Sequence, residues 1–327
     1  MRRILIAGGL ILALLAALAY WWPRQPMAFD GESIELAIEP GTPPKAVAQA
    51  VADAGVRVNP TLLYALFRFS GDARQIRAGN YEIERGLTPQ RLLLKLVRGE
   101  ESLQSLTLVE GWNWRQVREA LARAGNLRGD SRELTDAQIM ERLGQPGVPP
   151  EGRFFPDTYT YSRGSSDLKV LQRALHAMDR KLAAAWQQRA PDLPLKTPTE
   201  ALILASIVEK ETGKSSDRAQ IAGVFINRLR IGMLLQTDPT VIYGLGEAFD
   251  GNLRRRDLLA DTPWNTYTRA GLPPTPIAMP GKAALMAAVQ PAPTRALYFV
   301  ARGDGSSVFS ATLDEHNRAV NRYQRGQ

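Results

Sequence analysis

The sequence predicts an α+β protein that begins with a membrane-spanning helix and continues as a small and then a larger α+β part. Residues 4–22 contain no charged side chain. Short alternating stretches such as residues 34–38 predict strands. Apolar residues at helical spacing, bounded by proline and glycine, predict helices between and after these strands.

The N-terminal apolar run is long enough to cross a bilayer. Arg2 and Arg3 precede it and would stay in the cytoplasm, while Tyr20, Trp21 and Trp22 suit the opposite interface. We therefore expect residues 1–23 to be a cytoplasmic stub and a single-pass anchor in the cell inner membrane, with the rest on the periplasmic side. The alternative is a signal peptide cleaved near residues 17–19; the run exceeds the usual 7–15 residues of such a segment, which favours the anchor.

A polar connector at residues 24–33 leads to a small α+β module at residues 34–99. Strands are expected at residues 34–38 and 78–83. Pro and Gly punctuation predicts three helices, at residues 44–54, 60–69 and 89–98.

The next part, residues 100–150, is expected to hold a strand at 106–109, a helix that ends at 124 and a connector with one short helix. Residues 151–327 form the last part. It opens on the loop EGRFFPDTY, whose rings suit either a sugar-binding wall or a packed anchor. Helices are then expected at residues 168–187, from 198, and at 217–230, 282–289 and 313–325, with strands at 297–301 and 308–309 and a turn-rich polar run at 235–244.

The helix that starts at residue 198 has clear end signals. Thr197 can cap it, Pro198 fits its first position, and Glu200 completes a capping box. Residues 202–208 contain no breaker, and Gly213 supplies a stop. A helix of about four turns is therefore expected to end close to two glutamates.

The two glutamates, Glu209 and Glu211, point in different directions, about 160° apart. Glu211 lies on the most apolar side of the helix, with Leu204, Ile207 and Val208. A carboxyl at the edge of an apolar wall has a raised pKa, as a general acid needs. The alternative is an ordinary, half-solvated glutamate at a helix end.

The composition excludes several classes of site. With no cysteine there is no disulfide framework, thiolate catalysis or cysteine-ligated zinc, and with only His176 and His316 a histidine-based metal site or Ser-His-Asp triad has little support. The net charge of +8 favours a polyanionic partner. The basic residues lack the aromatic interleaving of a single-strand nucleic-acid groove, so anionic lipids and envelope polymers fit better.

Several long strings of this sequence resemble the YceG-like family of endolytic murein transglycosylases. They are EGRFFPDTY, ASIVEKET, VFINRLRIGMLLQTDPTVIYG, NTYTRAGLPPTPIAMPG and LYFVARGDG, which occur in this order. The resemblance implies an N-terminal anchor, a LysM-like module at residues 34–99 and a YceG-like catalytic domain at residues 151–327. It also implies Glu211 as the catalytic acid and base.

The reaction that the resemblance implies needs one carboxylate, no metal and no cofactor. Glu211 would protonate the bridging oxygen of the MurNAc–GlcNAc β-1,4 bond and then take a proton from the muramyl C6 hydroxyl. The product would carry a 1,6-anhydroMurNAc end, which makes the enzyme a lyase. Substrate-binding candidates from the family-like strings are Gln236, Asp238, Thr240, Tyr243, Asn265 and Tyr267. Partners would be peptidoglycan glycan strands, the cytoplasmic membrane and peptidoglycan synthases, and no nucleic acid.

Two other functions remain open. A glycan-binding scaffold without activity would lack any anhydromuropeptide product. A water-using muramidase would leave a reducing end instead.

Overall fold

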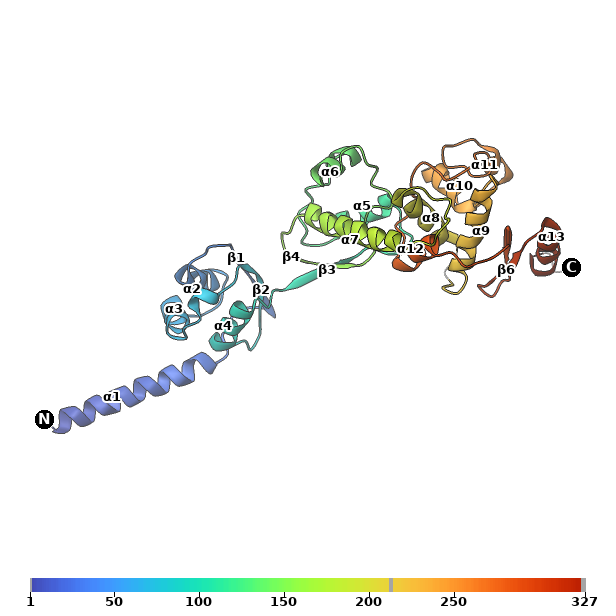
Figure 1. Cartoon of the computed structure of the whole chain (residues 1–327). Coiled ribbons are helices and arrows are strands. Elements are labelled where there is room, and N and C mark those ends of the chain that lie inside the picture. The colour runs from blue at the N-terminus through green and yellow to red at the C-terminus, as the bar shows by residue number, and fades with distance from the viewer. Residues whose placement is uncertain (1, 212–213, 325–327) are drawn as a thin grey trace. The chain divides into compact units, whose positions relative to one another are not determined.

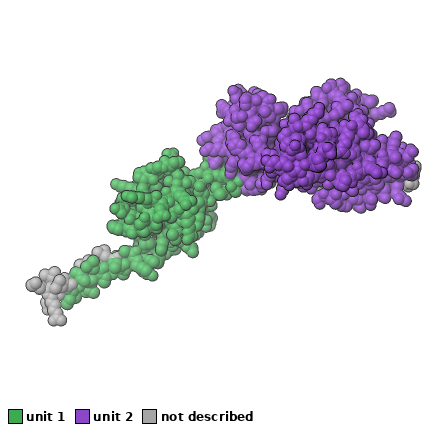
Figure 2. Space-filling view, viewed as in Figure 1, with its two compact units in different colours: residues 1–104, 160–164 green, residues 105–159, 165–327 purple. Residues whose placement is uncertain are grey.

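The computed structural model describes residues 2–211 and 214–324 (Figure 1). Thr212, the last residue of the ASIVEKET string, and Gly213, the expected helix stop, lie outside the described residues. The chain divides into two compact units, Met1–Gln104 with Thr160–Gly164, and Ser105–Tyr159 with Ser165–Gln327 (Figure 2).

The first unit begins with helix α1 (Arg2–Trp21) and a short 3-10 turn, η1 (Trp22–Arg24). Within residues 2–211 and 214–324, no helix combines the length and the apolar character that a bilayer crossing needs. The expected membrane-spanning segment is therefore not confirmed.

The rest of the first unit is a two-stranded sheet with three helices. Strands β1 (Ser33–Ile38) and β2 (Gly79–Glu84) pair antiparallel, and α2 (Pro44–Asp53), α3 (Pro60–Phe69), η2 (Ala73–Gln75) and α4 (Pro89–Arg98) complete it. The side chain of Asn59 caps α3, and Thr88 caps α4. Fully buried Phe67 and Tyr81 belong to the unit's own hydrophobic core. These elements match the strands and helices expected for residues 34–99.

The second unit is mainly helical. Strands β3 (Leu103–Thr107) and β4 (Thr158–Ser162) pair with each other and each include residues of both units. Within the second unit, β5 (Tyr298–Ala301) pairs antiparallel with β6 (Ser307–Ser310). The helices are α5 (Trp114–Arg123), α6 (Asp136–Arg142), α7 (Asp167–Gln187), α8 (Pro198–Glu211), α9 (Arg218–Arg230), α10 (Asp238–Leu245), η3 (Gly246–Ala248), α11 (Arg255–Leu259), α12 (Lys282–Val289) and α13 (Leu313–Gln324).

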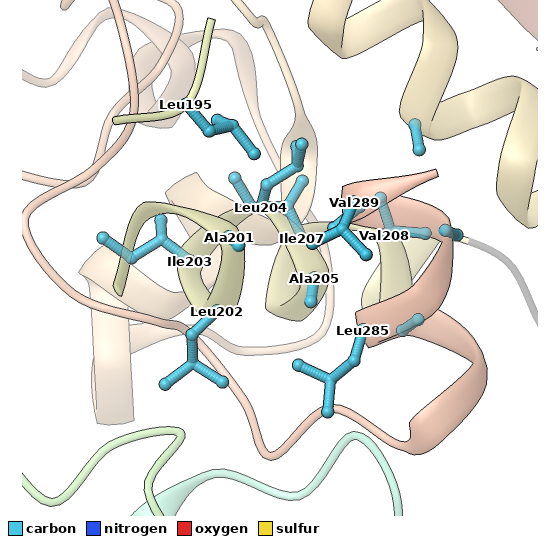
Figure 3. Packing of buried hydrophobic residues seen from close by; sticks show 14 of the residues in the cluster. Leu195, Ala201, Leu202, Ile203, Leu204, Ala205, Ile207, Val208, Leu285 and Val289 are labelled. Carbon is cyan, nitrogen blue, oxygen red and sulfur yellow. The ribbon is translucent and has the colours of Figure 1, made fainter. Parts of the chain in front are cut away.

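Helix α8 is the centre of the second unit's core. Its residues 201–208 are all buried, and α7, α9, α10 and α12 pack around it. Figure 3 shows Ile207 and Val208 of α8 beside Val289 of α12. Because residues 201–208 are buried on every side of the helix, burial alone does not distinguish the side of Glu211, which was expected to be the most apolar one. The Thr197 cap is confirmed, because Thr197 Oγ1 accepts a hydrogen bond from Glu200 N at 3.2 Å. The Glu200 carboxyl accepts from Lys196 N and not from the backbone of Thr197, so the second half of the expected capping box differs.

The polar run at residues 235–244 was expected to be turns, and that expectation is wrong. Residues Asp238–Leu245 form α10, which packs on α8. Pro239 lies in the first turn with an acidic residue, Asp238, before it. These residues are helix-start signals as much as turn signals, and contact with α8 favours the helix.

Candidate active site

Glu211, the last residue of α8, lines a cavity of about 580 Å³ in the second unit. Side chains of α9, β5 and α13 and of the segment before α10 complete its wall. A volume of this size falls in the range of small-ligand sites. Because α8 is buried, the backbone of Glu211 is held in place, and its carboxyl extends from a fixed position at the cavity wall.

The surroundings of the Glu211 carboxyl shift its pKa toward neutral pH. Burial raises its pKa to about 7, and the charge of Asp238 acts in the same direction. The hydroxyl of Thr237, which donates a hydrogen bond to Glu211 Oε1, and the guanidinium of Arg228 both lower it. An acid with a pKa near the working pH can both give and take a proton.

Arg228 of α9 brings a positive charge to the same cavity. Its guanidinium is buried and donates to the carbonyl oxygens of Leu235 and Leu297, each at 2.7 Å. Desolvation lowers the pKa of Arg228, and nearby Glu211 acts against this effect. The sequence analysis did not identify Arg228 as a site residue. The one feature that could have indicated it is its place in the family-like string VFINRLRIGMLLQTDPTVIYG.

Three of the six substrate-binding candidates line this cavity with Glu211. They are Gln236, Asp238 and Tyr267. The Tyr267 hydroxyl donates to Asp238 Oδ1 at 2.5 Å, and burial raises the pKa of Tyr267. Gln236 has a φ of +48°, and its backbone N–H donates to Thr266 O at 3.1 Å. A left-handed conformation is uncommon outside glycine, so this segment is held in an unusual shape at the cavity wall.

Two other candidates lie beneath the surface. Thr240 and Asn265 are fully buried. Thr240 Oγ1 donates to Thr237 O at 2.7 Å, and Asn265 Nδ2 donates to Ala260 O at 2.6 Å. The structure therefore places them as supports of the segments that bear Thr237 and Tyr267, and not at the cavity wall.

Tyr243, the sixth candidate, lines a different cavity. Its hydroxyl interacts with the carboxyl of Glu151, a residue that is only 6% exposed. Burial raises the pKa of Glu151 to about 7, while the hydrogen bond from Trp114 N and the interaction with Tyr243 lower it. Glu151 opens the EGRFFPDTY string but was not singled out from the sequence. Phe154 and Phe155 of that string are buried, so those rings act as packed anchors and not as a sugar-binding wall.

Glu209 has a structural partner and lies outside the Glu211 cavity. Its Oε2 accepts a hydrogen bond from Gly281 N at 2.8 Å, and its Oε1 lies 3.7 Å from Arg218 Nη2. Burial raises the pKa of Glu209. The two glutamates of the string thus face different surroundings, as their helical spacing predicts.

The residues that the structure describes contain no group of three histidine, aspartate or glutamate side chains placed to hold a metal ion.

Comparison with known proteins connects these features to one family. An endolytic murein transglycosylase of Bacillus subtilis (strain 168) is 28% identical over 324 residues, which cover 91% of this chain and 87% of that protein. A namesake of Streptococcus pneumoniae serotype 2 is 26% identical, and the match covers 98% of this chain and 65% of the relative's length.

The fold also has a solved counterpart. The 2.6 Å crystal structure of a putative yceG-like protein from Listeria monocytogenes matches with a TM-score of 0.56 at 28% identity, covering 88% of this chain and 98% of that one. The profile of the YceG-like family matches residues 36–322, which make up most of the chain and include Glu211. The chain therefore belongs to the YceG-like family.

Proposed function

We propose that this protein is an endolytic lytic transglycosylase that cleaves the MurNAc–GlcNAc β-1,4 bond inside peptidoglycan strands. One observation carries the proposal: a carboxyl with a pKa of about 7, that of Glu211, lines a cavity large enough for sugars in a chain whose relatives bear the name endolytic murein transglycosylase.

In the proposed reaction Glu211 acts first as an acid. Its carboxyl proton moves to the bridging oxygen, the C1–O bond of MurNAc breaks, and the bonding electrons leave with the GlcNAc hydroxyl. Positive charge develops at C1 and the ring oxygen, as in glycoside cleavage generally. Asp238 also lies in the cavity wall, and its charge would stabilise this transition state.

Glu211 then acts as a base. Its carboxylate takes the proton of the muramyl C6 hydroxyl while the C6 oxygen bonds to C1. The proton count of the enzyme returns to its starting value, water is not consumed, and the strand ends in 1,6-anhydroMurNAc. The hydrogen bond from Thr237 supports the ionised form between the two steps.

Mass spectrometry of the products tests the proposal. Purified protein is incubated with uncross-linked glycan strands, and the new ends are identified. We expect cleavage at internal bonds of the strands, which gives shorter strands that end in 1,6-anhydroMurNAc. Reducing ends would instead establish a water-using muramidase, and the absence of any new end would leave a glycan-binding scaffold.

The N-terminal segment and the first unit have proposed roles that rest on sequence. We propose that residues 4–22 anchor the protein in the cytoplasmic membrane, with the catalytic part on the periplasmic side, and that residues 34–99 form a LysM-like module that holds glycan. N-terminal sequencing of membrane-extracted protein tests the anchor. A mature chain that begins at residue 20 would contradict it in favour of a cleaved signal peptide.

A further inference from the structure

A second cavity, which we call the Glu151 cavity, lies in the same unit as Glu211 and takes no part in the proposed reaction. It measures about 680 Å³, and α5, α10 and η3 contribute to its wall. Four aromatic side chains line it, namely Trp114, Tyr243, Phe249 and Trp264. Protein interiors are close-packed, so a ring-lined space of this size is more than loose packing.

The polar ends of three of these rings are occupied inside the protein. Trp114 Nε1 donates to Asp136 Oδ1 at 2.8 Å, and Trp264 Nε1 donates to Thr275 Oγ1 at 2.9 Å. The Tyr243 hydroxyl interacts with the Glu151 carboxyl, which raises the pKa of Tyr243 beyond the effect of burial. The rings are therefore fixed in orientation before any ligand arrives, which lowers the entropy cost of binding.

Glu151 joins two walls of the cavity. Its carboxyl oxygens accept hydrogen bonds from Trp114 N, at 3.0 and 3.1 Å, and its side chain also meets the Tyr243 hydroxyl. Tyr243 in turn meets Trp264 edge to face, with ring centroids 5.4 Å apart. Because Glu151 is buried and partnered, we regard it as a positioning residue for the ring wall and not as a second acid.

The Glu151 cavity and the Glu211 cavity border the same two stretches of chain. Lys210 and Pro239 line the Glu151 cavity. Their chain neighbours, Glu211 and Asp238, line the Glu211 cavity. Consecutive helical residues point about 100° apart, so α8 and α10 form the boundary between the two cavities. Along α10, Asp238 and Tyr243 are separated by about 8 Å of helix rise, a span that neighbouring sugars of one strand can bridge.

The rim of the Glu151 cavity carries exposed charges. Arg115 of α5 and Glu247 of η3 both line it and form an ion pair at 3.1 Å. An exposed pair of this kind contributes little stability and opens at small cost. Lys210 adds a cation at the same cavity.

We propose that the Glu151 cavity is a second saccharide-binding site for the strand that the Glu211 cavity cleaves, where it holds sugars away from the cleaved bond. The occupant is an extended amino-sugar strand, since pyranose faces stack on rings and only a polymer can fill both cavities at once. This inference rests on the proposed function. It predicts that long strands bind more tightly than short ones, because short saccharides fill one cavity.

Phe249 offers the sharpest test, because its ring lines the Glu151 cavity and does not belong to the core cluster around α8. The experiment uses the full chain with Glu211→Gln, so that binding is measured without cleavage. Calorimetry with long glycan strands and with tetrasaccharides is compared before and after adding Phe249→Ala. We expect long strands to bind about three- to tenfold more weakly, with tetrasaccharide binding changed less than about twofold.

Three control variants separate a ring contact from a folding defect. Phe249→Tyr keeps the ring and should keep long-strand binding, whereas Phe249→Leu keeps apolar bulk and should lose it. Ile231→Ala removes an apolar side chain that is 63% exposed and lines neither cavity, and it should change nothing. With Glu211 present, Phe249→Ala or, if that variant does not fold, Phe249→Leu should raise KM for long strands and leave kcat unchanged.

Three results would overturn the inference. Phe249→Ala could weaken the binding of long strands and tetrasaccharides equally, or it could leave the affinity for long strands unchanged. The third result is that long strands do not bind to the protein at all. Failure of the proposed function looks different: long strands would bind, and depend on Phe249, while the protein with Glu211 intact released no new ends.

Discussion

The hydroxyl of Thr237 donates a hydrogen bond to Oε1 of Glu211. Thr237 precedes α10, and its backbone N–H donates to Thr266 Oγ1 at 3.1 Å, so the donor itself is held in place. A carboxyl oxygen that accepts this bond leaves the other oxygen, Oε2, to carry the proton. In the proposed reaction, this pair would fix which oxygen of Glu211 protonates the bridging oxygen of the substrate.

Thr237 should set the alkaline limb of the pH–rate profile. The proposed acid must be protonated, so kcat/KM should fall about tenfold per pH unit above about 7, where Glu211 ionises. Thr237→Val removes a bond that favours the carboxylate, so the limb should move to higher pH. Thr237→Ser keeps the hydroxyl and serves as control. Stopped-time assays over a pH series check this, and a limb that moves to lower pH in Thr237→Val contradicts the assignment.

The burial of Glu211 should cost stability at neutral pH. Its pKa is raised from 4.5 to about 7 in the folded state, so the folded protein binds more protons than the unfolded chain between these values. Its contribution to the free energy of unfolding therefore falls as pH rises through this window and stays low above it.

Glu211→Gln removes this ionisation and should be the more stable protein at pH 8, by up to ~3 kcal/mol at about 1.4 kcal/mol per pKa unit. This difference in the free energy of unfolding should vanish near pH 4, where Glu211 is protonated in the folded protein. Denaturant melts of both proteins at the two pH values measure it, and a difference that is constant with pH would show that Glu211 is not buried as described.

The module at residues 34–99 should bind glycan and not cleave it. Deleting it should weaken binding to isolated sacculi, while the second unit keeps part of its turnover on soluble strands, because Glu211 and its cavity belong to that unit. Pull-down with sacculi and a product assay on the same preparations check both halves. Sacculus binding that is unchanged after the deletion would count against the module's role.

Elements with local end signals could be predicted from the sequence. Helix α8 starts at Pro198 after the Thr197 cap, and α3 and α4 start at Pro60 and Pro89 in the same way. These signals act through hydrogen bonds within a few residues, so they do not depend on the rest of the fold. Asp238 and Pro239 show the limit, since the same residue types begin turns and helices and contact with α8 decides between them.

The site could be predicted only in part, for a related reason. The Glu211 position follows from helix spacing and the family-like string. Thr240, Tyr243 and Asn265 come from the same polar strings, but Thr240 and Asn265 are buried supports and Tyr243 lines the other cavity. A side chain's direction at a loop or helix start depends on distant partners, such as the carbonyl of Ala260 for Asn265. Arg228 and Glu151 were missed because buried charges are defined by what covers them, which composition does not reveal.

The central claim, that Glu211 alone gives and takes the proton, is tested most directly by comparing Glu211→Gln with Glu209→Gln on the same glycan strands. We expect both variants to fold, as judged by their melting curves. Glu211→Gln should lose cleavage by at least about 10²–10⁴-fold, since glutamine keeps the shape of the side chain but cannot transfer the proton. Glu209→Gln should retain most of its activity, because Glu209 lies outside the cavity with Gly281 and Arg218. An active Glu211→Gln together with an inactive Glu209→Gln would contradict the account.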